Sequence, residues 1–162
     1  MRVYENRSIN PGQGNKTIQK LINDGRLQKV TSSREHADRL LTQSRNHLIS
    51  TEKTAHHDPE GAYSSLYDAA RKSLVAVLEV QGLRPTSKGG HIVICEAIQA
   101  QIDPPFSEAI TPFNRMRKLR NAHEYPGFEE PELTTSDVLE DLEKSKTIVD
   151  LAEFLLHQFP VF

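Results

Sequence analysis

The sequence contains very little cysteine: Cys95 is the single thiol among 162 residues. One thiol excludes an internal disulfide framework, and it excludes a metal site built from several thiolates of one chain. No apolar stretch approaches the roughly 18 residues of a membrane-spanning helix, and the N-terminus lacks a hydrophobic signal segment. We therefore expect a cytoplasmic protein that does not enter a membrane.

Neither sign of charge is in excess. The chain has 20 Lys and Arg against 22 Asp and Glu, so its formal net charge is −2. A molecule of this kind is not a polycation, and any contact with nucleic acid must come from a local cluster of cations. The length and the hydrophobic share of 36% are typical of one folded domain rather than of a disordered or fibrous chain.

Apolar residues recur at helical spacing along most of the chain, and no segment shows a convincing strand alternation. Residues 1–30 are predicted to form an N-terminal arm with a short helix within 16–27. Five helical segments follow, over residues 33–54, 58–82, 91–102, 103–125 and 134–159. We predict an all-α fold, an up-and-down bundle of four to five helices over 31–162 with a short N-terminal extension.

Local signals mark where three of these helices begin. Asp58 precedes Pro59, which combines a capping carboxylate with a proline suited to the first helical position. Asp103 precedes two prolines in the same way. Thr134 and Asp137 have the spacing of a capping box, in which each side chain bonds the backbone of the other residue.

The segment 103–125 carries the most informative pattern. At about 100° per residue, one arc of this helix holds Phe106, Ala109, Ile110, Phe113 and Met116. The same arc continues with Arg117, Arg120, His123 and Glu124. Burying such groups without partners costs several kcal/mol, so we expect them to be paired or to border a cleft or interface.

This end of the helix is also locally basic, because Arg115, Arg117, Lys118 and Arg120 fall within six residues. Guanidinium groups match phosphate oxygens in pairs, and a histidine can move a proton near neutral pH. These are the minimum parts for cleavage of a phosphodiester without a metal. The simpler alternative is a solvated face with an Arg120–Glu124 ion pair one turn apart.

Three stretches resemble the HEPN domain superfamily of small prokaryotic helical bundles: AYSSLYDAARKSL, GLRPTSKGGH and RMRKLRNAHEYPG. The resemblance covers about residues 31 to 160. It implies a metal-independent RNase without a cofactor, often the toxin of a toxin–antitoxin or phage-defence system. It also implies a homodimer whose interface forms the site, and a partner such as an antitoxin or a nucleotidyltransferase.

The family motif is an Arg, four to six residues and a His, which Arg117 and His123 satisfy. Under this alignment Arg117, Arg120 and His123 are the catalytic candidates. Tyr125 follows as His-x-Tyr, similar to the tyrosine that partner nucleotidyltransferases modify in one subfamily. Asn121 would orient its neighbours, and Arg115 and Glu124 complete the candidate binding residues.

A second alignment takes Arg120-Asn121 as the motif pair and Glu124-Tyr125-Pro126 as the downstream landmark. His123 is then incidental, and the chain resembles members without the catalytic histidine. Such a protein would be a non-catalytic helical module that binds a nucleotide or a partner protein. The sequence leaves both alignments open.

Other candidates are weaker. Tyr63, Tyr67 and Arg71 share one side of the helix over 58–82, where they either line a cleft or, as we favour, pack the bundle. Cys95 lies on an apolar stripe with Ile92, and we expect it to be inert. We predict no metal site.

Overall fold

The computed structural model describes residue 4, residues 6–124, residue 127 and residues 131–162. Its elements are α1 (Asn15–Asn23), β1 (Leu27–Lys29), α2 (Arg34–Thr54), α3 (Pro59–Val80), β2 (Leu83–Pro85), α4 (Ile92–Ile102), α5 (Thr111–Glu124) and α6 (Thr135–Leu155). The predicted all-α class is confirmed, since the only sheet in the described ranges has two strands of three residues each. None of the helices described is both long enough and apolar enough to cross a membrane.

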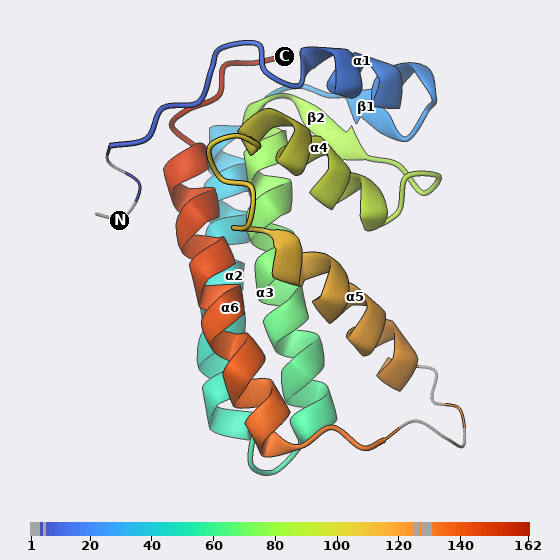
Figure 1. Ribbon diagram of the computed structural model, residues 1–162, viewed down its shortest axis with the longest axis vertical. Helices are drawn as coiled ribbons and strands as arrows, with labels where there is room; N and C mark the ends of the chain where they lie inside the picture. Colours follow the sequence, from blue (N-terminus) through green and yellow to red (C-terminus); the bar gives the residue numbers. More distant parts are fainter. Residues whose placement is uncertain (1–3, 5, 125–126, 128–130) are drawn as a thin grey trace.

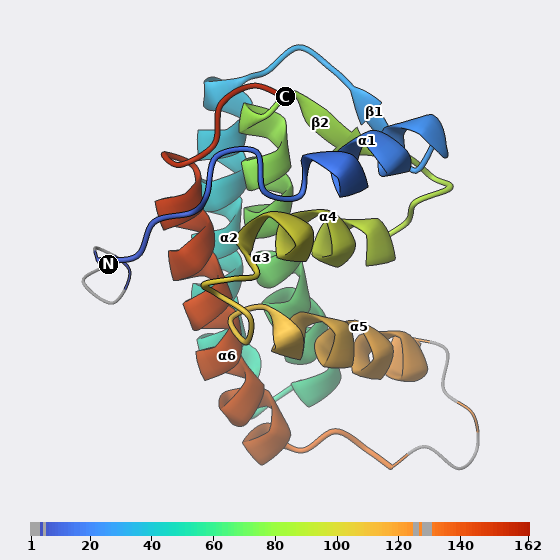
Figure 2. The ribbon, with the colours of Figure 1, turned by 45° about the horizontal axis from the view of Figure 1, so that its top comes forward.

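Helices α2, α3 and α6 are the longest elements, and they lie side by side (Figure 1). Helix α3 is the central one: it packs on α2, α6, α5 and α4, and most of its apolar residues are buried. Helices α4 and α5 lie across one flank of α3 (Figure 2). This arrangement leaves part of α3 between α2 and α5 uncovered, and half-buried polar residues such as Asp68 and Arg71 lie there.

Two predicted helix starts are confirmed in atomic detail. The Asp58 carboxylate accepts a hydrogen bond from the Gly61 amide at 2.9 Å, and Pro59 opens α3. At the start of α6 the Thr134 hydroxyl accepts from the Asp137 amide at 3.2 Å, and the Asp137 carboxylate accepts from the Thr134 amide at 2.9 Å. Both bonds of the capping box are therefore present.

The predicted helix start at Asp103 is wrong. Residues 103–110 form turns, and α5 begins at Thr111. The physical reason is Pro112, which has no amide hydrogen and would clash with the preceding turn inside a continuous helix. In the first turn of a helix the same proline is well tolerated.

The predicted end of the last helix at Phe159 is also too late, because α6 ends at Leu155. The amides of His157 and Gln158 bond carbonyls three residues back, which closes the last turn. Pro160 further disfavours helical backbone at the residue before it.

The sheet was not predicted. Strand β1 pairs antiparallel with β2, with Leu27 opposite Pro85. Strands of three residues are too short to display an alternation that the sequence pattern could reveal. The pairing attaches the segment before α2 to the end of α3.

Helix α1 packs on α4. Its Ile18 and Leu21 are buried in the same core as the residues of the long helices. Gly14 precedes α1 at a positive φ of 80°, and a Cβ at this position would lie 2.6 Å from the Ala100 carbonyl oxygen. Only glycine allows this close approach of α1 to α4.

Candidate functional site

The apolar arc of α5 is buried against α3. Phe113 and Met116 are fully buried, and the Phe113 ring stacks on Tyr67 of α3 with centroids 5.4 Å apart. The polar residues that continue this arc therefore also face α3. The arc predicted from helical spacing is present, although the helix that carries it begins later than expected.

Beyond the apolar arc, Arg120 contacts α3, and the charge of Arg117 acts on Tyr67 of α3 and on Cys95 of α4. The Arg120 guanidinium carbon lies 6.0 Å from the centre of the Tyr67 ring. The Tyr67 hydroxyl lies 2.8 Å from Nδ1 of His91, the residue that precedes α4. Arg71, one turn after Tyr67 on α3, adds a third guanidinium group, whose Nε donates to the Asp68 carboxylate at 3.0 Å. We call Arg71, Arg117 and Arg120, together with Tyr67 and His91, the arginine cluster.

The electrostatics of Tyr67 and His91 show that the three arginines act on both groups. Burial raises the pKa of Tyr67 to about 12, while the charges of Arg71, Arg117 and Arg120 oppose that rise. Burial lowers the pKa of His91, and the same three arginines lower it further. Tyr67 is therefore protonated at neutral pH and His91 is uncharged, so the cationic groups here are the arginines.

Arg117 is the least satisfied member of the cluster. Its Nε is buried and has no hydrogen-bond partner in the described part of the chain. A buried guanidinium N–H without an acceptor is costly, and an anionic ligand would supply the missing acceptor. A buried, unpaired donor beside two other arginines is what a phosphate site requires.

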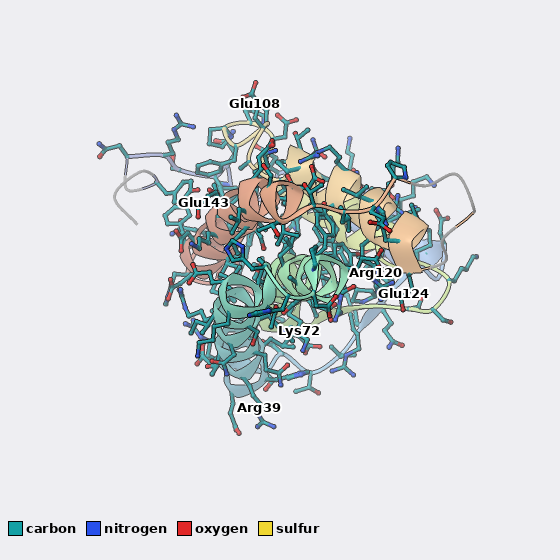
Figure 3. All side chains as sticks on the ribbon, turned by 90° about the horizontal axis from the view of Figure 1, so that it is seen from below. Arg39, Lys72, Glu108, Arg120, Glu124 and Glu143 are labelled. Atoms are coloured by element: carbon teal, nitrogen blue, oxygen red, sulfur yellow. The ribbon has the colours of Figure 1, made fainter. Side chains whose placement is uncertain are left out.

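Arg120 has partners within its own helix, as the simpler interpretation predicted. It lies 3.5 Å from the Glu124 carboxylate and donates to the side-chain oxygen of Asn121 at 3.3 Å. Figure 3 shows Arg120 and Glu124 close together at the end of α5, next to α3. Exposed pairs of this kind are weak, so Glu124 does not prevent the guanidinium group from binding a phosphate.

His123, on α5, faces a different part of α3. Its side chain is only 7% exposed, and its Nδ1 is 3.8 Å from the carboxylate of Glu60 in the first turn of α3. Glu60 and Tyr67 are two helical turns apart, roughly 10 Å along the axis. The structure thus places Arg120 at Tyr67 and His123 nearer the beginning of α3.

Arg115 points away from the arginine cluster and toward α6. It forms an ion pair with Asp141, whose side chain is 3% exposed. The same carboxylate accepts from the Tyr63 hydroxyl at 2.7 Å and from Lys144 at 3.0 Å. Arg115 and Tyr63 therefore belong to a buried network that joins α3, α5 and α6.

Sequence reasoning missed His91 as a member of the site and favoured a packing role for Tyr67 and Arg71. The one-turn spacing of Tyr67 and Arg71 indicates that the two side chains share one face of a helix. His91 lies 24 residues after Tyr67, and no sequence pattern indicates that they are in contact. Tyr125, the predicted modification residue, lies outside the described residues, as does Pro126.

The remaining candidates are the Cys95 thiol and groups of side chains that could hold a metal ion. Burial raises the pKa of Cys95 to about 11, so its thiol is protonated at neutral pH. Within the ranges that the structure describes, no three His, Cys, Asp or Glu side chains gather where they could hold a metal ion.

The fold and the site define an all-α protein with a partly buried arginine cluster between three of its helices. No family model, curated protein or solved structure matches the chain.

Proposed function

We propose that the protein is a HEPN-like helical module that binds RNA through its arginine cluster, without a metal or cofactor. The observations that carry this proposal are the Arg120 guanidinium over Tyr67, Arg71 one turn further along α3, and the buried Nε of Arg117, which has no hydrogen-bond partner among the described residues. The charges of all three arginines act on both Tyr67 and His91. Since the net charge of the chain is −2, this concentration of cations is local and not a property of the whole surface.

The chemistry of the cluster favours a phosphate. Three guanidinium groups on two helices provide planar pairs of donors that match phosphate oxygens. The surroundings are partly desolvated, since Tyr67 and Phe113 beneath them are fully buried. Charge-assisted hydrogen bonds are stronger there than at an exposed surface.

An RNA titration in EDTA tests the binding proposal. We expect Arg117→Met and Arg120→Met each to weaken binding roughly 10-fold, because a hydrogen bond to a charged group is worth about 1.5–3 kcal/mol. The salt dependence should become shallower in both variants, since fewer phosphate contacts release fewer counterions.

Arg39→Met is the matched control, because Arg39 is an exposed helical arginine paired with Glu35. Equal affinity of all three variants and the original protein would refute RNA binding at the cluster. Absence of RNA binding by the original protein would do the same.

Metal-independent RNA cleavage is the second candidate function, and the position of His123 favours it. The Glu60 carboxylate lies 3.8 Å from Nδ1 of His123, within ion-pair range but beyond hydrogen-bond distance, so a negative charge lies beside the imidazole. In the proposed step a ribose 2′-oxygen bonds to phosphorus as its proton leaves, and the bond to the 5′-oxygen breaks. The 5′-oxygen gains a proton, and a 2′,3′-cyclic phosphate remains.

In this step His123 would accept the proton of the 2′-hydroxyl and pass it to the departing 5′-oxygen, and Arg117 and Arg120 would stabilise the charge on the phosphate oxygens. The test is incubation with RNA in EDTA, followed by detection of the cyclic phosphate. We expect His123→Gln to abolish cleavage and to retain RNA binding. If the variant and the original protein give identical products, cleavage by His123 is refuted, and the non-catalytic RNA-binding module remains as the proposed function.

The HEPN resemblance adds two further parts to the proposal. One is a homodimer in which the two sites lie near the interface, which light scattering of the purified protein tests. The other is an antitoxin or nucleotidyltransferase partner that acts on the end of α5, including Tyr125.

A further inference from the structure

A groove of about 410 Å³ adjoins the arginine cluster, between α2, α3, β2 and the start of α4. Arg71 and His91 line it and thus belong to both the groove and the cluster. Its volume lies within the range of roughly 300–1,000 Å³ that is usual for small-ligand sites. One end of the groove therefore has the donors that a phosphate needs.

Glu79 lines the groove as well and is an unusual residue there. Its side chain is 2% exposed, and its Oε1 accepts from Nε of Arg84 at 2.9 Å. Its Oε2 is buried and has no hydrogen-bond partner among the residues described. Nδ1 of His36, whose side chain is 42% exposed, lies 3.4 Å from this same Oε2.

A buried carboxylate oxygen without a donor is costly, and it selects for a ligand that brings one. Oε1 of the Glu79 carboxylate accepts from Arg84, so the acceptor capacity that remains for a ligand lies on Oε2, beside His36. An amino group is the donor that fits such a position.

Between these two ends the groove is lined by aliphatic side chains, namely Leu40, Val75, Pro85 and Ile94. Side chains of this type pack against a flat ring without competing for its hydrogen bonds. Arg71, Val75 and Glu79 follow one another at one-turn spacing on α3, so the groove offers a cationic donor, an apolar middle and a buried acceptor in this order, with Arg84 beside the acceptor. A nucleotide has the matching order of phosphate, planar base and amino group.

We propose that this groove holds one nucleotide of the bound RNA and prefers a base with an exocyclic amino group, which donates to Oε2 of Glu79. The phosphate of that nucleotide lies at Arg71 and His91. This inference rests on the proposed RNA binding and specifies which unit of the RNA is recognised. Uracil is disfavoured, because it presents carbonyl oxygens where cytosine and adenine present an amino group.

The test uses the full chain and calorimetric titration with CMP, AMP, UMP and inorganic phosphate. We expect CMP and AMP to bind roughly 10-fold more tightly than UMP, the discrimination that one specific base contact provides. Glu79→Gln replaces the acceptor with an amide that also donates. The variant should therefore bind CMP and AMP more weakly than the original protein, and its affinity for UMP should not fall. If Glu79 is only structural, Glu79→Gln lowers the affinity for CMP, AMP and UMP equally, and this result would overturn the inference.

Two further variants keep the test decisive even where Glu79→Gln is unstable. Val75→Phe fills the apolar middle and should abolish nucleotide binding while inorganic phosphate still binds. Glu140→Gln, an exposed carboxylate on α6, is the control and should change nothing. Retained CMP binding in Val75→Phe would overturn the inference.

The outcomes also separate this inference from the proposed function. If the protein binds RNA and Arg120→Met weakens that binding, but no mononucleotide binds at millimolar concentration, the groove inference is wrong and RNA binding stands. If nucleotides bind with the expected preference but RNA does not, the inference stands only as a mononucleotide site and the proposed function is wrong.

Discussion

Asp141 is a buried charge whose partners come from three helices. It accepts from Tyr63, pairs with Arg115 and Lys144, and has a side chain that is 3% exposed. Burial and this carboxylate raise the pKa of Tyr63, so its hydroxyl stays protonated and donates. Removal of the acceptor leaves a buried hydroxyl and a guanidinium group without their partner.

Asp141→Ala should therefore lower the free energy of unfolding by about 2–4 kcal/mol, as measured by urea denaturation. Glu140→Ala removes the exposed partner of the same Lys144 and should cost less than about 0.5 kcal/mol. Equal losses in the two variants would show that the buried network does not stabilise the fold.

His91 reports directly on the charge of the arginine cluster. Burial, and then the charges of Arg71 and Arg120, lower its pKa below the usual 6.5; Asp68 opposes this shift, and Arg117 has the smallest effect. A bound phosphate adds negative charge near the ring and favours the imidazolium form. We expect inorganic phosphate to raise the pKa of His91 in an NMR titration, and phosphate binding to strengthen as the pH falls through that value.

Arg71→Met should also raise the pKa of His91 in the free protein, because one of the neighbouring positive charges is removed. Arg39→Met is the control for a general change of charge, since Arg39 pairs with Glu35 on α2. The same His91 titration curve with and without phosphate would contradict binding at the cluster.

Among the helices, α6 depends on its capping box for a defined first turn. Thr134 is exposed, and its hydroxyl makes two bonds with Asp137: it accepts from the Asp137 amide and donates to the Asp137 carboxylate at 2.8 Å. Thr134→Ala should lower the free energy of unfolding by roughly 1 kcal/mol. A chemical denaturation curve measures this loss.

Thr147→Ala is the matched change inside the same helix, where the exposed hydroxyl bonds only the Glu143 carbonyl. Since alanine is the better helix former, this variant should be as stable as the original protein or slightly more so. A loss as large as that of Thr134→Ala would argue against a specific capping effect.

For the whole molecule, the main question is whether the N-terminal segment belongs to the same cooperative unit as the bundle. Helix α1 has nine residues and is too short to be stable alone. It is docked, with Ile18 fully buried in the core shared with the long helices. Strand β1 joins the sheet with β2 in addition.

Ile18→Ala should consequently destabilise the entire protein by about 2–5 kcal/mol and keep a single unfolding transition in circular dichroism. Ile49→Ala, at a position that is 50% exposed, should stay within about 0.5 kcal/mol of the original protein. Two separate transitions in Ile18→Ala would show that the segment before α2 unfolds independently.

The limits of sequence reasoning follow from which interactions are local. Asp58 and Thr134 revealed the starts of α3 and α6, because a cap bonds a backbone amide three residues away. Asp103 carried a similar signal and was misread, since Pro112 further along restricts where α5 can begin. The strands β1 and β2 could not be found, because each is three residues long and pairs with a segment more than 50 residues away.

The same distinction holds for the candidate site. Helical periodicity alone placed Arg117 and Arg120 on the arc that continues the buried face of α5, and composition with spacing established an all-α chain. The docking of α3 and α4 against α5 brought Arg71 and His91 to these arginines and placed His123 beside Glu60. The packing around α3 also buried Glu79 beside the groove. These contacts join residues far apart in the chain, and their geometry depends on how whole helices pack, which no local pattern of residues encodes.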